Sequence, residues 1–159
     1  MTLSFAISPC PNDTFIYGAI ANQLIESPHE FEFSYHDIET LNKMAQTGKT
    51  DLIKMSFYNY FHVKDNYRLL PCGGALGRGV GPLLITKNIN EFQGHNSIRI
   101  AIPGKNTTAN FLLNFYNPEY TELIEFPFDK IEQAVLNGDV EAGVIIHENR
   151  FTYKNKGLK

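Results

Sequence analysis

The chain has 159 residues, of which 43% are hydrophobic and 19% are charged, so it can bury a core and is not an intrinsically disordered chain. Its net charge of −3 comes without a stripe of Lys and Arg, which argues against a nucleic-acid partner. The first residues lack a signal-peptide pattern, and no segment reaches the roughly 20 apolar residues that span a bilayer. We therefore expect a cytoplasmic protein with no membrane partner, in which Cys10 and Cys72 are free thiols.

Predicted strands and helices alternate along the whole chain. In chain order, periodicity and turn residues predict a strand at 3–8, a helix at 15–24, a strand at 31–35, a helix at 38–45, a strand at 51–55, a helix at 56–61, strands at 83–86 and 98–102, a helix at 108–116, a strand at 123–126, a helix at 129–136 and a strand at 140–146. This alternation is typical of the α/β class with largely parallel sheets.

A polar segment at 88–97 divides this alternation into two parts. We interpret it as a linker or hinge, which leaves one α/β lobe over 1–87 and a second over 98–159. Clefts between lobes are preferred sites for small ligands, so a two-lobed chain would bring strand ends from both lobes around one molecule.

Small polar residues stand where predicted strands give way to predicted helices. Asn12 and Asp13 follow the first strand. Ser56 follows the third, and Thr107 precedes the helix at 108–116. In an open α/β sheet this carboxyl edge is where ligands bind, and the N–H groups of a helix start favour an anion. The favoured local interpretation is nevertheless that these residues cap helices, which is common for Asn, Asp, Ser and Thr.

Lys54 lies at the end of the strand at 51–55, two residues before Ser56. An ammonium group at this position could pair with a carboxylate, and the Ser56 hydroxyl could donate to the same group. The alternative for Lys54 is a solvated surface charge, and local sequence favours that alternative.

The run 73–81 is rich in glycine and suggests a phosphate-binding loop at first sight. It lacks the Lys-Ser/Thr pair of the G-x-x-x-x-G-K-[ST] pattern, so we reject that interpretation. Glycine here either lets the backbone approach a ligand closely or lets a connecting loop bend.

The strand at 140–146 ends in His147, the strongest candidate for chemistry. An imidazole at the carboxyl end of a buried strand is well suited to accept a proton near neutral pH. The alternative is a histidine whose ring is satisfied by a backbone carbonyl. Strand alternation would turn the adjacent Glu148 to the opposite side, so it is a weak partner for the ring. The five histidines are scattered and no C-x-x-C is present, so no metal site is predicted.

Six segments of the chain, taken in order, carry a family resemblance. They are Ser-Pro-Cys-Pro-Asn-Asp-Thr-Phe (8–15), Asp-Ile-Glu-Thr-Leu-Asn (37–42), Lys-Met-Ser-Phe (54–57), Gly-Ala-Leu-Gly-Arg-Gly-Val-Gly-Pro-Leu-Leu (74–84), Ile-Pro-Gly with Thr-Thr-Ala (102–104 and 107–109) and Ala-Gly-Val-Ile-Ile-His-Glu-Asn-Arg-Phe-Thr-Tyr (142–153). Together they resemble the 1,4-dihydroxy-6-naphthoate synthases of the futalosine route to menaquinone.

The resemblance implies a fold, a reaction and a set of site residues. The fold would be the two-lobed, periplasmic-binding-protein-like (type II) α/β fold, used in the cytoplasm. The reaction would be that of a lyase that converts cyclic dehypoxanthinylfutalosine to 1,4-dihydroxy-6-naphthoate with no metal or organic cofactor. His147 would be the general base. The implied substrate-binding residues are Lys54, Met55, Ser56, Thr107, Thr108, Ala109 and Asn110, with Asn12, Asp13 and Asn42 as further candidates.

Members of the family continue past the position of Lys159. The resemblance therefore implies a fold that is incomplete at the C-terminus, with two partial lobes whose exposed apolar surface could support a homo-oligomer. Three alternatives stay open: the chorismate dehydratase of the same pathway, a module that binds a small molecule without catalysis, and an inactive fragment. His147 favours an enzyme over a receptor, and the first and last segments favour the synthase over the dehydratase.

Overall fold

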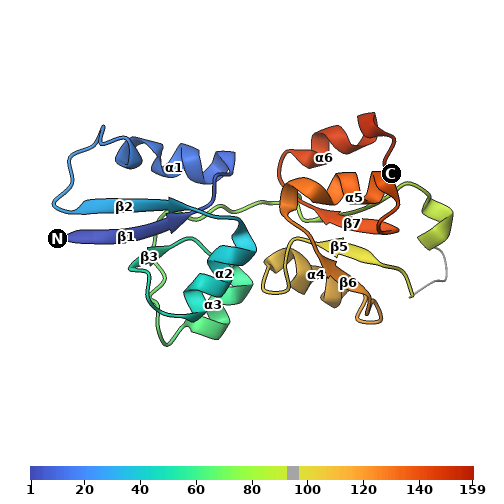
Figure 1. Ribbon diagram of the computed structural model, residues 1–159, viewed down its shortest axis with the longest axis horizontal. Coiled ribbons are helices and arrows are strands. Elements are labelled where there is room, and N and C mark those ends of the chain that lie inside the picture. Colours follow the sequence, from blue (N-terminus) through green and yellow to red (C-terminus); the bar gives the residue numbers. More distant parts are fainter. Residues whose placement is uncertain (93–96) are drawn as a thin grey trace. The chain divides into compact units, whose positions relative to one another are not determined.

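The computed structural model describes residues 1–92 and 97–159, which form two compact units, Met1–Leu76 and Gly77–Lys159 (Figure 1). The division falls earlier than the expected linker at 88–97. The reason is the strand at 83–86, which pairs with a strand of the second unit and so cannot belong to the lobe expected over 1–87. Within the expected linker, Ile89–Phe92 form a short 3₁₀ helix, and 93–96 lie outside the described residues.

Unit 1 contains a three-stranded sheet and three helices. Its elements are β1 (Thr2–Ile7), α1 (Pro11–Ala21), β2 (Glu30–Tyr35), α2 (Ile38–Gln46), β3 (Leu52–Ile53) and α3 (Phe57–Val63). The strand order is β2-β1-β3 and both pairings are parallel, with Phe5 opposite Phe33 on one side and Leu52 on the other. The parallel arrangement expected from the alternation is confirmed in this unit.

The starts of α1 and α2 differ from each other in how they are capped. The Asp37 carboxylate caps α2, because it accepts hydrogen bonds from the backbone N–H groups of Glu39 and Thr40. The α1 cap position is Cys10, whose side chain makes no capping bond, and the proline at the first helical position fixes the backbone there. The prediction that Asn12 or Asp13 caps α1 is therefore wrong.

Unit 1 has a thin apolar interior. Its buried apolar residues are Ala6, Ile7, Leu41, Ala45 and Val63. The Phe5 ring lies between α1 and β2, with its centroid 4.9 Å from the rings of both Tyr17 and Phe33. Phe15 on α1 is 89% exposed. The apolar spacing thus predicted the helix correctly, but the apolar face of that helix is not fully buried.

Unit 2 contains a four-stranded sheet. Its elements are β4 (Leu83–Thr86), η1 (Ile89–Phe92), β5 (Ile100–Ile102), α4 (Thr108–Tyr116), β6 (Leu123–Glu125), η2 (Phe128–Lys130), α5 (Ile131–Asn137), β7 (Ala142–Ile145), α6 (Asn149–Thr152) and η3 (Tyr153–Lys156). The strand order is β4-β7-β5-β6, in which β4 is antiparallel to β7 and the other two pairings are parallel. The expected strands at 98–102, 123–126 and 140–146 are all present but shorter.

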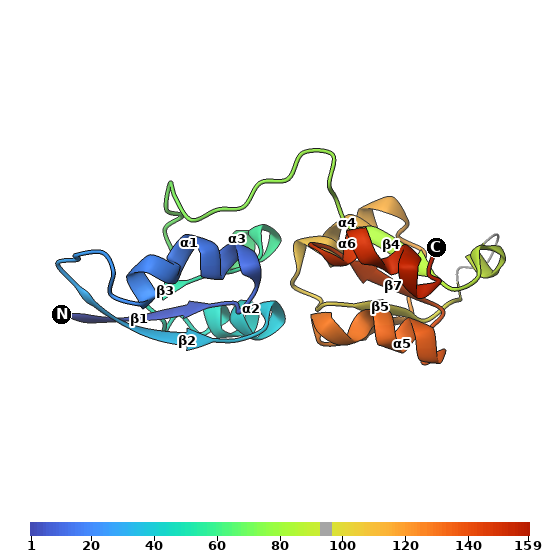
Figure 2. The same ribbon diagram turned by 90° about the horizontal axis from the view of Figure 1, so that it is seen from above.

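Helices α4 and α5 cover opposite faces of the unit 2 sheet (Figure 2). Ala109 and Leu113 of α4 pack on one face, and Ile131 and Val135 of α5 pack on the other. Gly143 in β7 permits the close approach of α5, because a Cβ there would lie 2.6 Å from Cγ2 of Ile131. Among the described helices, none is both long enough and apolar enough to cross a bilayer.

Candidate functional site

The two units repeat one strand order, β2-β1-β3 in unit 1 and β6-β5-β7 in unit 2. In such sheets the chain moves to one side of the first strand and then to the other, and ligands bind outside the carboxyl ends where this order reverses. That point lies between β1 and β3 in unit 1 and between β5 and β7 in unit 2. The sequence-predicted site residues follow these four strands or, in the case of Asn42, lie on the helix after β2.

Asp13 joins the ends of β1 and β3 in unit 1. Its side chain is almost completely buried, and one carboxylate oxygen accepts hydrogen bonds from the backbone N–H of Ser8 (3.1 Å) and its hydroxyl (2.8 Å). The other oxygen pairs with the Lys54 ammonium at 2.5 Å. Because the Lys54 side chain is 20% exposed, the pair fixes an ammonium at the sheet edge without removing it from solvent. The alternative of a purely solvated Lys54 charge is excluded.

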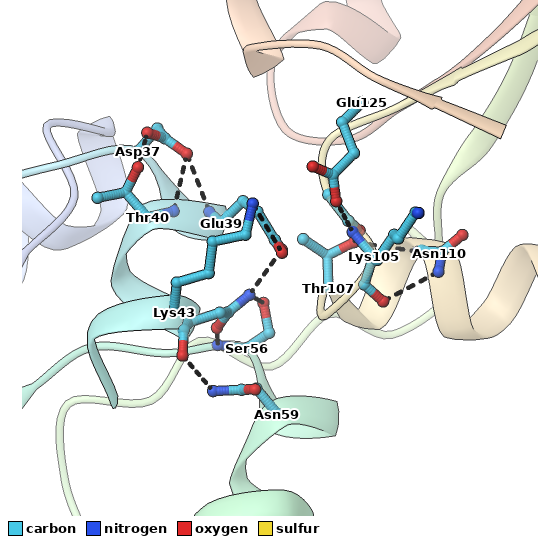
Figure 3. Close-up of polar contacts among 12 residues, drawn as sticks. Asp37, Glu39, Thr40, Lys43, Ser56, Asn59, Lys105, Thr107, Asn110 and Glu125 are labelled. Carbon is cyan, nitrogen blue, oxygen red and sulfur yellow. Dashed lines mark hydrogen bonds and ion pairs between the residues drawn. The ribbon is translucent and has the colours of Figure 1, made fainter. Parts of the chain in front are cut away.

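Ser56 stands at the start of α3 but does not cap it with its side chain. Its hydroxyl instead accepts a hydrogen bond from the Asn42 side-chain amide at 3.1 Å, and its backbone N–H donates to the Asn42 carbonyl oxygen at 2.9 Å (Figure 3). The structure thus brings Asn42 and Ser56 together. The local interpretation of Ser56 as an N-cap hydroxyl is wrong.

Asn59 on α3 is a member of this cluster that sequence reasoning missed. It is fully buried, and its side-chain N–H₂ donates to the Asn42 backbone carbonyl (3.1 Å) and lies 3.9 Å from the Met55 sulfur. Its side-chain oxygen has no hydrogen-bond partner in the described structure. A polar residue inside the aromatic run 57–61 was the one signal that could have found it. Asn12, by contrast, lies exposed on α1.

Two carboxylates near this edge have nearby hydrogen-bond donors or cations. Burial raises the pKa of Asp37, but hydrogen bonds from the Thr40 hydroxyl and from the first N–H groups of α2 outweigh that effect and lower it below its ordinary value. The buried Glu39 carboxylate lies 3.8 Å from the Lys43 ammonium and 3.5 Å from the Asn42 amide nitrogen (Figure 3). The edge of unit 1 is therefore built from charged and amide groups in fixed orientations.

In unit 2, the loop between β5 and α4 is held by its own side chains. The buried Thr107 hydroxyl accepts from the Asn110 backbone N–H (3.2 Å) and donates to the Gly104 carbonyl (2.7 Å), so the expected threonine cap is confirmed. The Asn110 side chain donates to the Lys105 carbonyl (3.0 Å), and the Lys105 N–H donates to the Glu125 carboxylate (2.9 Å; Figure 3). These contacts fix the turn through which the start of α4 reaches the sheet edge.

Thr108 and Ala109 open α4 beside this turn. Thr108 is half-buried, whereas Ala109 is 4% exposed and packs in the apolar cluster on this face of the sheet. Ala109 also lines an apolar groove of about 400 Å³. The groove lies along α4 and is lined further by Pro82, Leu83, Leu84, Thr86, Ile89, Leu112, Leu113, Tyr116 and Val144.

His147 follows the end of β7 and is exposed. Its φ of 57° lies in the left-handed region, which costs most residues about 1–3 kcal/mol but is tolerated several-fold better by Asn, Asp and His. The Phe128 ring meets the imidazole edge-on, with centroids 5.6 Å apart. The chain has left strand geometry before His147, so alternation does not determine the direction of Glu148.

The edge of unit 2 thus pairs an exposed imidazole with a helix start after β5, and the edge of unit 1 presents an ammonium and a hydroxyl. The unit 1 edge can bind an anionic or carbonyl oxygen, and the imidazole of the unit 2 edge can accept a proton. Among residues 1–92 and 97–159, no three His, Cys, Asp or Glu side chains gather where they could hold a metal ion. Cys10 is half-buried, Cys72 is exposed, and both are free thiols.

Sequence comparison identifies the family. The family described as menaquinone biosynthesis matches residues 3–159. The chain belongs to this family. It is 46% identical over 156 residues to the 1,4-dihydroxy-6-naphthoate synthase of Thermus thermophilus, covering 98% of this chain and 56% of that protein. It is 40% identical over 163 residues to the synthase of the same name from Streptomyces coelicolor, covering 99% and 57%.

Comparison with solved structures bears on the fold. A protein from Archaeoglobus fulgidus has a TM-score of 0.90 at 37% identity, over 99% of this chain and 58% of that one. An arginine-bound ArgBP from T. maritima has a TM-score of 0.62 at 16% identity, over 99% and 80%. At such low identity the second likeness speaks for the fold alone, which is periplasmic-binding-protein-like. The chain spans a little more than half the length of the curated relatives it matches.

Proposed function

We propose that this protein acts as a 1,4-dihydroxy-6-naphthoate synthase, the lyase that converts cyclic dehypoxanthinylfutalosine in menaquinone biosynthesis. The observation that carries the proposal is His147, an exposed imidazole whose backbone holds it where the strand order of unit 2 reverses. The identity of 46% to the Thermus thermophilus synthase directs the choice of substrate. Because the chain spans 56% of that relative, the activity is to be tested on this chain itself.

In the proposed reaction, His147 is the general base. Its neutral imidazole takes a proton from a substrate hydroxyl, and the electron pair of that O–H bond forms a carbonyl. The adjoining C–C bond breaks as in a retro-aldol reaction, and its electron pair passes to the fragment that carries the ring, which takes up the proton as it becomes the aromatic naphthalene. A general base of this kind contributes roughly 10²–10⁴-fold to the rate.

Substrate binding is proposed for the edges of both units. The Lys54 ammonium and the Ser56 hydroxyl are suited to a carboxylate, and Met55 lies between them in the sequence. Thr108 and Ala109 would contribute the start of α4. Thr107 and Asn110 use their described hydrogen bonds within the loop, so we assign them to holding the turn rather than to direct contact.

The first test is turnover by the chain and by His147→Asn. Asparagine tolerates the left-handed backbone that position 147 requires, so the variant removes the base while leaving the fold unstrained. We expect the wild-type chain to release the naphthoate and the variant to lose about 10²–10⁴-fold in kcat. His29→Asn, at an exposed histidine of unit 1, is the matched control and should keep full turnover.

The absence of naphthoate from reactions with the wild-type chain would overturn the proposal for this chain. Binding of the substrate without turnover, measured by calorimetry, would instead favour the non-catalytic module. The fold is also used by an L-cysteine solute receptor from Neisseria gonorrhoeae (TM-score 0.62, 17% identity, over 99% of this chain and 70% of that one), so fold does not separate the two functions.

Three further features complete the proposal. We place the reaction in the cytoplasm, with a small molecule and no nucleic acid as partner. We also propose self-association through exposed apolar side chains, which include Phe15, Leu24 and Phe115. Sedimentation of the chain as a monomer at all concentrations would remove the last of these.

A further inference from the structure

Asn42 is fully buried, so it has no surface to offer a ligand. Two of the hydrogen bonds of its side chain nevertheless go to one half-buried residue at the sheet edge, Ser56. Asn42 therefore cannot contact a ligand directly, but it can act on one through the orientation of the Ser56 hydroxyl.

The orientation of the Asn42 amide follows from the chemistry of its partners. The backbone N–H of Ser56 can only donate, so the group 2.9 Å from it must be the Asn42 carbonyl oxygen. The N–H₂ end then faces the Ser56 hydroxyl at 3.1 Å and, with its second hydrogen, the Glu39 carboxylate at 3.5 Å (Figure 3). If the amide were flipped, its N–H₂ group would face the Ser56 N–H, which is also a donor. Its oxygen would face the Glu39 carboxylate, which is also an acceptor.

This orientation fixes the role of the Ser56 hydroxyl. Its oxygen accepts from Asn42, so its own hydrogen must point elsewhere. Within the described residues, no acceptor takes that hydrogen, and the hydroxyl makes no capping bond to α3. Asn59 supports the arrangement from below by donating to the Asn42 backbone carbonyl.

We propose that Asn42 is a positioning residue that directs the hydrogen of the Ser56 hydroxyl to the ligand, so that this hydroxyl serves as a hydrogen-bond donor. The subsite would then favour a carboxylate or carbonyl oxygen over a group that needs an acceptor. The proposal rests on the proposed function only for the identity of the ligand, whose naphthoate carboxylate suits such a donor. The polarity of the hydroxyl is independent of that function.

Asn42→Asp reverses the polarity at constant shape. The new carboxylate still accepts from the Ser56 N–H, but it also accepts the hydroxyl hydrogen, which turns away from the ligand. We expect Asn42→Asp and Ser56→Ala each to weaken binding of 1,4-dihydroxy-6-naphthoate by about 10- to 100-fold, the usual value of one hydrogen bond to a charged group. The double variant should bind no more weakly than either single one, because both remove the same bond.

Calorimetry of the four proteins provides this comparison. Wild-type affinity in Asn42→Asp, or additive losses in the double variant, would overturn the proposal. If the wild-type chain does not bind the naphthoate, that result contradicts the proposed function. The direction of the Ser56 hydroxyl is then tested by an experiment that needs no ligand.

That experiment is an NMR titration of the carboxyl group at position 42. In Asn42→Asp, its pKa should be lower when Ser56 is present than when Ser56→Ala is added, because the hydroxyl donates to the charged form. Equal pKa values would contradict the proposal.

Asn42→Ala serves if the buried carboxylate prevents folding beside Glu39. Hydrogen exchange of the Ser56 N–H should then accelerate at least tenfold. The N–H of Lys54, which donates to the Ala6 carbonyl at 2.8 Å, is the internal control and should be unchanged. Equal acceleration at both amides would mean general loosening and would overturn the positioning role.

Discussion

The two units share an order of parallel strands but differ in what lies beneath their strand ends. In unit 1 the buried polar residues Ser8, Asp13, Glu39, Asn42 and Asn59 lie close to the carboxyl edge. In unit 2 the buried polar residues at the corresponding edge are Thr107 and Asn110 of the turn before α4, two apolar clusters pack on the faces of the sheet, and His147 has a left-handed backbone. Hydrogen bonds therefore set the direction of the Lys54 and Ser56 groups, whereas packing and backbone geometry set the place of His147.

Because the two units differ in how much apolar surface they bury, we expect them to differ in stability. Burial of apolar surface contributes about 25 cal/mol per Å² and is the main favourable term in folding, whereas buried polar groups contribute little beyond offsetting their own desolvation. Unit 2 buries a helix against each face of its sheet, and unit 1 buries few apolar side chains. We expect unit 1 to be the less stable unit, and the following changes test that difference.

Asp13→Ala should have the largest effect. It leaves the Ser8 N–H and hydroxyl without their buried acceptor and the Lys54 ammonium without its carboxylate. Because each hydrogen bond to a charged group contributes about 1.5–3 kcal/mol, we expect a cost of about 3–5 kcal/mol. We expect unit 1 to lose hydrogen-exchange protection while unit 2 keeps it. Asp65→Ala, at an exposed position of the same unit, is the control. Equal loss of protection in both units would show that they do not differ as described.

Gly143→Ala tests the packing of unit 2. The added Cβ would lie 2.6 Å from Cγ2 of Ile131 and 3.0 Å from Cγ2 of Val135, both in stiff, buried side chains. We expect a loss of about 1–3 kcal/mol in the free energy of unfolding, measured by urea denaturation. Gly18→Ala in α1 of unit 1, where nothing lies within 4 Å of the added Cβ, should instead stabilise its unit by up to about 1 kcal/mol. A neutral Gly143→Ala would mean that α5 packs less closely than the structure indicates.

The smallest expected effect concerns acid stability. The pKa of Asp37 in unit 1 is lowered as described above. In unit 2, hydrogen bonds from the Arg99 side chain lower the pKa of Glu141, against a smaller rise from burial. A lowered pKa contributes stability above the unfolded value, and that stability is lost as the pH falls through the folded value.

Asp37→Asn should therefore flatten the acid dependence of unit 1, and Glu141→Gln that of unit 2, between about pH 5 and pH 2. Asn also caps helices well, so Asp37→Asn should cost little at neutral pH. The measurement is exchange protection of each unit across this range. If the acid dependence of stability were unchanged in either variant, the loss of stability at low pH in that unit would come from other carboxylates.

Local sequence predicted the elements well and their contacts poorly. The helix at 108–116 begins and ends as expected, because its threonine cap and apolar spacing are local signals. The strand at 83–86 was also predicted, but its antiparallel partner is β7, and nothing within four residues of Leu83 indicates that pairing. Asp13 was misassigned as a cap because its partner Lys54 lies 41 residues away.

The sequence by itself determined the α/β class, the order of the elements, the family and the placing of polar residues at strand ends. These depend on the periods of helix and strand and on short motifs, which are encoded within a few residues. Only the tertiary structure decided which strand ends meet, that Asp13 holds Lys54, and that the Asn42 amide donates to the Ser56 hydroxyl. Those contacts join residues distant in the chain, and they form only when parallel strands bring their carboxyl ends to one edge.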